Sequence, residues 1–168
     1  MKTLAETYFF RGLAPRQIEH IKALAEERSF AKGAYIVEVG QELTYLHVIR
    51  EGRVRVIVPL RTRADAAPGL PPQGDADERD QEERLAEMGP GESIGEFSYA
   101  DRKPASATVV ALEPTRTFAL AHQDLDRLLA SDAAIARSVL GAMLERVVGQ
   151  LRRTDADLVL ARYVLRVV

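Results

Sequence analysis

The most informative segment of this chain is GEFSYADRKPASATVVA, which runs from Gly95 to Ala111. The glycine at its start lets the backbone approach a ligand closely. A one-turn helix after that glycine would leave backbone N–H groups free to face an anion. Pro104 is expected to break this helix, and Ser106 and Thr108 supply hydroxyl groups beyond it. The segment therefore predicts a turn that can cradle a phosphate.

Length and composition favour one globular domain. The chain has 168 residues, 46% of them hydrophobic, which suits a single domain with a moderate core. Its net charge of −2 gives no overall basic field that would draw it to nucleic acid or to a membrane. The absence of cysteine excludes disulfides and thiolate metal sites. Because we find no signal peptide and no apolar run of membrane length, we expect a cytoplasmic protein.

The spacing of apolar residues changes twice along the chain. From Pro15 to about Glu27 they recur at helical intervals, and from Ser29 they form short β-branched and aromatic runs separated by glycine. Helical spacing returns at His122. We therefore predict one domain that is mainly β with flanking helices. Its parts would be short helices in residues 1–28, an antiparallel, jelly-roll-like β-roll in 29–121 and helices in 122–168.

Within the predicted roll, one segment should be a hairpin and another a flexible loop. Residues 105–111 and 116–120 are expected to pair as a hairpin around Glu113 and Pro114. Residues 61–83 are rich in proline, glycine and acidic side chains, and cannot bury enough apolar surface to offset the entropy lost on ordering. We interpret them as a flexible acidic insertion. A solvated loop is the simpler interpretation, and a docking role is the alternative.

The C-terminal helix carries an apolar seam. Its members alternate steps of four and three: Leu140, Leu144, Val147, Leu151, Thr154, Leu158, Ala161, Leu165 and Val168. Such a heptad pattern is typical of a coiled coil. Because no second helix of this chain could receive the seam, we predict a parallel homodimer through it. The alternative is that the seam packs on the chain's own roll, although Ile135, Val139 and Val148 lie off the seam and could serve that purpose.

One motif carries a resemblance to a known family. Gly95-Glu96, followed at the right distance by Pro104-Ala105-Ser106-Ala107-Thr108-Val109, resembles the phosphate-binding cassette of the cyclic-nucleotide-binding domain family. The resemblance extends over nearly the whole chain, from the first helices through the roll to the last helix. It implies a β-roll between helices, a regulatory or sensor role without catalysis, and cyclic AMP or cyclic GMP as the ligand.

The resemblance also implies the site. Glu96 would accept a hydrogen bond from the ribose 2′-hydroxyl, and Ser106 would contact the cyclic phosphate. Thr154 on the last helix is a candidate for contact with the base. The full set of predicted ligand-binding residues is Gly95, Glu96, Phe97, Ser98, Arg102, Lys103, Ala105, Ser106, Ala107 and Thr108. Few residues follow Leu165, so we expect no nucleic-acid contact from this chain alone, and an effector domain or partner protein would be separate.

The cassette departs from the family pattern at Ala105. The family has an arginine there, which pairs with the cyclic phosphate. A charge-assisted hydrogen bond is worth about 1.5–3 kcal/mol, so its loss should weaken binding by roughly tenfold to a hundredfold. Either Arg102 or Lys103 reaches round Pro104 to restore the charge, or the site has decayed. In the second case the chain would be a dimerising scaffold without ligand, and Glu96 would only cap the short helix. We favour weak binding of a cyclic nucleotide, or binding of another anionic ligand.

Enzymatic and metal-binding functions are not expected. The three histidines, His20, His47 and His122, are scattered over a predicted helix face, a strand and a helix start. A metal-binding cupin would share the β-roll but needs clustered histidine and carboxylate ligands. A catalytic serine would need a base and a group to orient that base, and neither is evident. We therefore predict a binding module without catalytic residues, metal or cofactor.

Overall fold

The computed structural model describes residues 3–59 and 82–167 of the chain, and side chains for residues 3–58 and 86–156. Its elements in chain order are η1 (Leu4–Glu6), α1 (Pro15–Leu24), β1 (Glu26–Phe30), β2 (Tyr35–Val37), β3 (Tyr45–Glu51), β4 (Val54–Pro59), β5 (Glu82–Met88), β6 (Ser93–Ile94), α2 (Glu96–Asp101), β7 (Thr108–Ala111), β8 (Thr115–Ala121), α3 (His122–Ser131) and α4 (Ala133–Val167).

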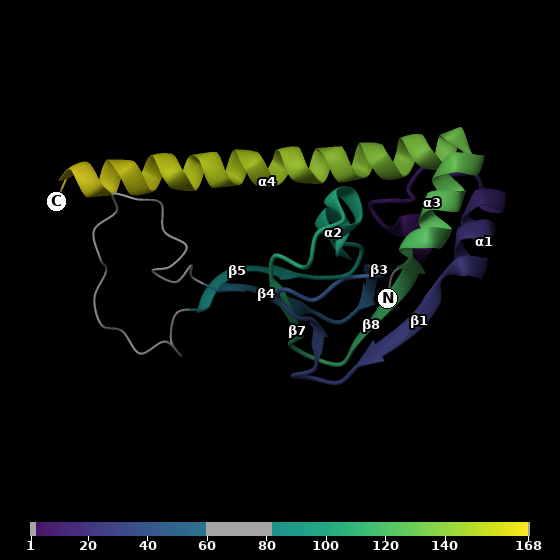
Figure 1. Cartoon of the computed structure of the whole chain (residues 1–168), viewed down its shortest axis with the longest axis horizontal. Helices are drawn as coiled ribbons and strands as arrows, with labels where there is room; N and C mark the ends of the chain where they lie inside the picture. Colours follow the sequence, from purple (N-terminus) through teal and green to yellow (C-terminus); the bar gives the residue numbers. More distant parts are fainter. Residues whose placement is uncertain (1–2, 60–81, 168) are drawn as a thin grey trace.

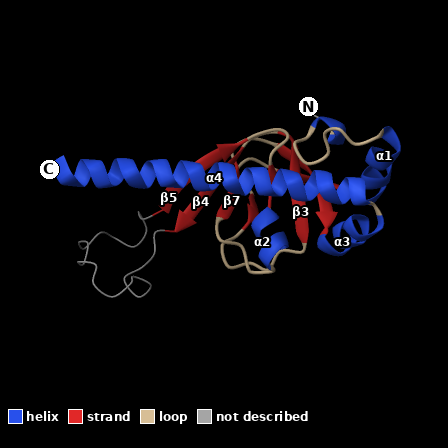
Figure 2. Ribbon diagram, turned by 90° about the horizontal axis from the view of Figure 1, so that it is seen from above, coloured by secondary structure: helices blue, strands red, loops and turns tan. Residues whose placement is uncertain are grey.

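The strands form two four-stranded antiparallel sheets. Their orders are β1-β8-β3-β6 and β2-β7-β4-β5. Figure 1 shows α4 lying along the roll, with α1 and α3 gathered at the end where α4 begins. Seen from above in Figure 2, α4 crosses the strands and α2 lies beside it. The predicted antiparallel β-roll with flanking helices is confirmed.

The apolar residues make two cores on opposite faces of the β1-β8-β3-β6 sheet. Neighbouring residues of a strand point to opposite faces, and both Val48 and Ile49 of β3 are fully buried. Val48 belongs to the cluster beneath the helices, together with Phe118 and Leu125. Ile49 belongs to the cluster inside the roll. The sheet is therefore packed against helices on one side and against the second sheet on the other.

One predicted boundary and one predicted strand pairing were wrong. Helix α1 ends at Leu24, three residues short of the predicted end, because β1 begins at Glu26 and pairs with Ala119 of β8. The predicted hairpin between residues 105–111 and 116–120 does not form. Strand β7 pairs with β2 and β4, whereas β8 pairs with β1 and β3. The turn at Glu113 and Pro114 carries the chain from one sheet to the other.

The predicted acidic insertion overlaps the described residues only at its end. Glu82 and Glu83 belong to β5 and pair with Pro59 and Val58 of β4. The rest of the predicted loop, up to residue 81, lies outside the described residues.

Helix α4 has a buried first part and an exposed continuation. Asp132 caps it, since its Oδ1 accepts hydrogen bonds from the N–H groups of Ala134 at 2.8 Å and Ile135 at 3.1 Å. Ile135 and Val139 are fully buried in the core, as predicted, but Val148 is 39% exposed and does not serve the roll. Exposed seam residues follow: Leu140, Leu144, Val147 and Leu151. The seam side chains Leu158, Ala161, Leu165 and Val168 lie outside the described residues.

In the part of the chain that the structure describes, no helix is both long and apolar enough to cross a membrane.

Candidate ligand-binding site

A cavity of about 470 Å³ lies between the 95–108 segment, the strands of the second sheet and α4. Its apolar lining is Val37, Leu43, Val56, Val58, Ala86, Met88, Ile94, Phe97, Ala105, Ala107 and Val109. The other lining residues are Glu87, Glu92, Ser93, Gly95, Glu96, Ser98, Ser106, Arg146, Gln150, Arg153 and Thr154. The cavity is within the size range of small-molecule sites, and its composition, apolar with a few convergent polar groups, is typical of them.

The first wall of the cavity begins at Gly95. This residue has a φ of 94°, and a Cβ added to it would lie 3.1 Å from the carbonyl oxygen of Tyr45. Glycine is therefore required for both conformation and space. The predicted one-turn helix follows as α2, and it ends at Asp101 because Arg102 adopts a left-handed conformation with a φ of 58°. The helix thus stops before Pro104, which was expected to break it.

The segment after Pro104 is held against the turn that follows β2. The N–H of Ala105 donates to the carbonyl oxygen of Gln41 at 2.8 Å, and the carbonyl of Ala105 accepts from the N–H of Gly40 at 2.8 Å. Ala105 is buried and lines the cavity. The position of the missing arginine is therefore fixed by backbone contacts rather than by a side chain.

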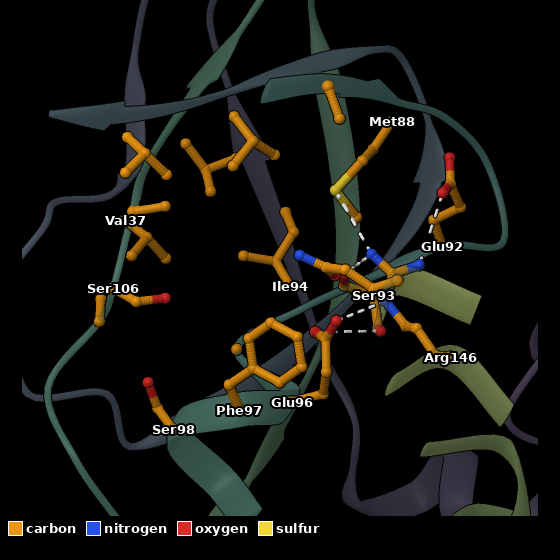
Figure 3. A pocket seen from close by; sticks show the side chains of 18 of the residues that line it. Val37, Met88, Glu92, Ser93, Ile94, Glu96, Phe97, Ser98, Ser106 and Arg146 are labelled. Carbon is orange, nitrogen blue, oxygen red and sulfur yellow. Dashed lines mark hydrogen bonds and ion pairs between the residues drawn. The ribbon is translucent and has the colours of Figure 1, made fainter. Parts of the chain in front are cut away.

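Two hydroxyl groups of this wall face the cavity. Figure 3 shows Ser98 on α2 and Ser106 on the following loop, with both side chains directed toward the same space. Neither hydroxyl makes a hydrogen bond to another residue that the structure describes. Thr108 was also predicted to face the ligand, but its hydroxyl accepts the N–H of Val39 at 3.1 Å and it is not part of the lining. Thr108 therefore joins β7 to the chain after β2.

Neither cation beside Pro104 reaches the cavity. The Nη2 of Arg102 is 2.7 Å from Oδ1 of Asp126, and its guanidinium lies 4.6 Å from the centre of the Tyr99 ring. Lys103 lies 3.7 Å from Asp101. The structure gives no support to the hypothesis that one of them replaces the cassette arginine.

The contact to Asp126 also affects ionisation next to the cassette. Tyr99 donates to the Asp126 carboxylate at 2.8 Å. Burial, together with this hydrogen bond, raises the pKa of Tyr99 to about 12. The same hydrogen bond lowers the pKa of Asp126. Tyr99 thus stays a neutral donor that ties α2 to α3.

The second wall of the cavity is a polar face of α4, and it contains a residue that the sequence analysis missed. Nε of Arg146 donates to Oε1 of Glu96, and Ser93 Oγ donates to Oε2 of the same carboxylate at 3.2 Å. Arg146 also lies 3.5 Å from Glu92 (Figure 3). Glu96 is only 6% exposed. The carboxylate predicted to accept a ribose hydroxyl is therefore already paired with α4.

The spacing along α4 could have revealed this face. Arg146, Gln150, Arg153 and Thr154 all line the cavity, and their separations of four, seven and eight residues place them on one side of a helix. Thr154, predicted as a candidate base contact, does lie at the cavity, and its hydroxyl donates to the carbonyl of Gln150 at 3.1 Å. The sequence analysis had also placed Thr154 in the apolar seam of the helix.

The histidines lie away from the cavity lining. His47 is buried, and its Nδ1 is 3.0 Å from Thr117 Oγ1. Burial lowers the pKa of His47 to about 4, so the imidazole is neutral near neutral pH. His122 is also buried, and its ring packs edge-on against Tyr99 at 5.2 Å. Within the described residues, no group of three or more histidine, aspartate or glutamate side chains could hold a metal ion.

Comparison with known proteins gives consistent results. The family model described as "Cyclic nucleotide-binding domain" matches residues 27–132. The cyclic AMP receptor protein of Thermus thermophilus is 31% identical over 149 residues, which cover 89% of this chain and 59% of that protein. The cAMP-dependent protein kinase regulatory subunit of Aspergillus niger is 26% identical over 86% of this chain and 33% of its own length. This chain thus spans less than two thirds of both relatives.

Solved structures share the fold. The crystal structure of Thermus thermophilus catabolite activator protein superposes with a TM-score of 0.69 at 30% identity, covering 92% of this chain and 62% of that one. The sensor domain of the Pseudomonas aeruginosa transcriptional regulator DNR gives a TM-score of 0.65 at 19% identity, covering 89% of each chain, and this likeness concerns the fold alone.

Proposed function

Since this chain belongs to the cyclic nucleotide-binding domain family, we propose that it is a regulatory module that senses a small anionic ligand. The ligand occupies the cavity between the 95–108 cassette and α4. Its binding changes how α4 is held, and α4 passes this change to a partner or effector unit.

The observation that carries this proposal is the contact between Glu96 and Arg146. This ion pair joins the cassette to α4 at the wall of the cavity, and the Glu96 side chain is only 7% exposed. A ligand that enters beside the pair must either add contacts to it or compete with it. Either event changes the free energy with which α4 is held against the roll, so binding and helix position are coupled.

Cyclic AMP and cyclic GMP should bind this cavity weakly. The cassette keeps its glycine and two hydroxyls, but Ala105 offers no charge to a phosphate. A neutral hydrogen bond contributes about 0.5–1.5 kcal/mol, against about 1.5–3 kcal/mol for a charge-assisted one. An anion whose charge pairs with a cation elsewhere in the cavity would not lose this binding free energy.

We also propose that the module works as a homodimer through α4. The seam residues Leu140, Leu144 and Leu151 are 52%, 65% and 58% exposed. Exposed leucines repeated along one side of a helix favour association with a second copy of that helix.

One observation favours a second function, a dimerising scaffold without ligand. The carboxylate of Glu96, which would accept a ligand hydroxyl, is already satisfied by Arg146 and Ser93. In a scaffold this network would simply lock α4 onto the roll. The two functions differ in whether anything enters the cavity.

Amide hydrogen exchange of the full chain, with and without millimolar cyclic AMP or cyclic GMP, tests the proposed function. We expect added protection in residues 95–108 and in 133–156, because the ligand bridges both walls. The matched control is Ala105→Glu, whose carboxylate would repel the anion and remove the added protection. Unchanged exchange in both segments with either nucleotide would favour the scaffold.

A further inference from the structure

The cavity is chemically polarised, and its cassette end is neutral. Ala105, Ser98 and Ser106 line this end, and the nearby cations Arg102 and Lys103 are paired with Asp126 and Asp101 outside it. Its hydroxyl groups can donate to a neutral oxygen atom. They provide no full charge for an anion.

The α4 end of the cavity holds the cations. Arg146 is matched by Glu96 and Glu92, so its charge is already balanced. Arg153, two turns further along the same helix face, also lines the cavity. Within the described residues the Arg153 guanidinium has no ion pair and no hydrogen bond, and its neighbour on that face, Gln150, adds an amide. Arg153 is thus the cation available to a ligand.

Between the two ends the lining is apolar. Val37, Ile94 and Val109 belong to the buried cluster inside the roll, and all three contribute to the cavity. In Figure 3, Val37 and Ile94 face the space beside the hydroxyls, with the Arg146 network on the other side. A ligand that fills this space must bury apolar surface.

We propose that the preferred ligand is an amphipathic monocarboxylate. Its carboxylate lies at Arg153 and its apolar body extends toward Ala105, so that its charge points away from the cassette. This inference rests on the proposed function, since it concerns the same cavity. The carboxylate and apolar body are the shared chemistry of two sources, aliphatic acids and arylalkyl acids.

Calorimetric titration with matched probes tests this inference. The anionic probes are octanoate for the aliphatic source and 3-phenylpropanoate for the aromatic one, and whichever binds more tightly identifies the source. Octan-1-ol and octylammonium keep the aliphatic body but remove or reverse the charge. We expect octanoate to bind roughly tenfold more tightly than octan-1-ol, the size of one charge-assisted contact, and octylammonium to bind more weakly than both.

Variants of α4 locate the carboxylate. Arg153→Ala should weaken binding of the better acid roughly tenfold, and Arg153→Lys should weaken it less because the charge is kept. Arg152→Ala, an exposed arginine outside the lining, is the matched control and should leave affinity unchanged. Ala105→Arg should weaken binding of the acid, because the longer side chain fills the cassette end toward which the apolar body extends, and it should strengthen binding of cyclic AMP.

The outcomes separate this inference from the proposed function. Equal affinity for octanoate and octan-1-ol, or no effect of Arg153→Ala, overturns the inference. If cyclic AMP protects the cassette and α4 while neither acid binds, the inference falls and the proposed function stands. If neither the acids nor the nucleotides bind wild type or Ala105→Arg, both fall. If both Arg153→Ala and Ala105→Arg weaken binding of the acid, the result supports a carboxylate at Arg153 and an apolar body at the cassette end.

Discussion

The two walls of the cavity are built in different ways. The cassette wall is one continuous segment, and backbone geometry shapes it. Gly95 has a positive φ and a close carbonyl neighbour that disfavour any side chain, and Ala105 is held by two backbone hydrogen bonds. The α4 wall comes from a helix whose Arg146 is fifty residues from Glu96 in sequence, and its chemistry is charge. One wall therefore sets the shape of the cavity and the other supplies its cations.

This difference shows why a motif can preserve a fold and yet not fix a ligand. The cassette turn depends on a glycine and on local hydrogen bonds, which survive the replacement of arginine by Ala105. Preference for an anion depends on where positive charge lies in three dimensions. In this molecule the cations of the lining lie on α4, so we propose that the wall outside the motif selects the ligand.

The largest expected effect concerns the exposed apolar seam of α4 at Leu151, which lies outside the cavity lining. Leu151→Asp places a charge in the exposed seam and should abolish the dimer, because a carboxylate buried without a partner is strongly unfavourable. Light scattering should give twice the 18.6 kDa chain mass for wild type and the monomer mass for the variant. Arg152→Asp, next to the seam, should retain the dimer mass. A monomer mass for wild type would contradict the proposed dimer.

The next effect tests the contact between the walls. Arg146→Ala leaves the buried carboxylate of Glu96 without its cation, and removal of one partner of a buried pair costs about 3 kcal/mol or more. Urea unfolding should therefore show a loss of about 3 kcal/mol in the free energy of unfolding. Arg152→Ala, on the same helix but exposed, should change it by about 0.5 kcal/mol or less. Similar small losses in both variants would mean that the pair does not hold α4.

A smaller effect compares a glycine of the cassette wall with a glycine of α4 that lies outside the cavity lining. Gly95→Ala forces a Cβ to within 3.1 Å of the Tyr45 carbonyl oxygen at a positive φ, and should cost about 2 kcal/mol of stability. Gly141→Ala lies inside α4, where its Cβ meets nothing within 4 Å, and should add about 0.5–1 kcal/mol of stability. Opposite signs in urea unfolding would confirm that backbone shape constrains Gly95 and does not constrain Gly141. A harmless Gly95→Ala would refute this.

The fold could be predicted from the sequence because its signals are local. Glycine-separated strands, helical spacing at both ends and the capping Asp132 each depend on a few neighbouring residues. The predicted hairpin around Pro114 failed for the opposite reason. Which sheet a strand joins depends on distant partners, and two strands joined by a short turn can enter different sheets.

The site was predicted unevenly for the same reason. Gly95, Ser98, Ala105 and Ser106 were found because they belong to one segment, and all four line the cavity. Arg102 and Lys103 were chosen for their closeness in sequence, yet their charged groups pair with Asp126 and Asp101. Arg146 and Arg153 were missed because their helix was analysed for its apolar seam and not for its polar face.

The measurement that most directly tests the central claim is the affinity of cyclic AMP for wild type, Ala105→Arg and Ala105→Gln by calorimetry. If the cassette wall keeps its shape and lacks only a charge, Ala105→Arg should bind roughly tenfold or more tightly than wild type, about 1.4 kcal/mol or more. Ala105→Gln, of similar length but neutral, should gain less than Ala105→Arg. Equal affinities for all three proteins would contradict the claim that a single missing charge separates this cavity from a cyclic-nucleotide site.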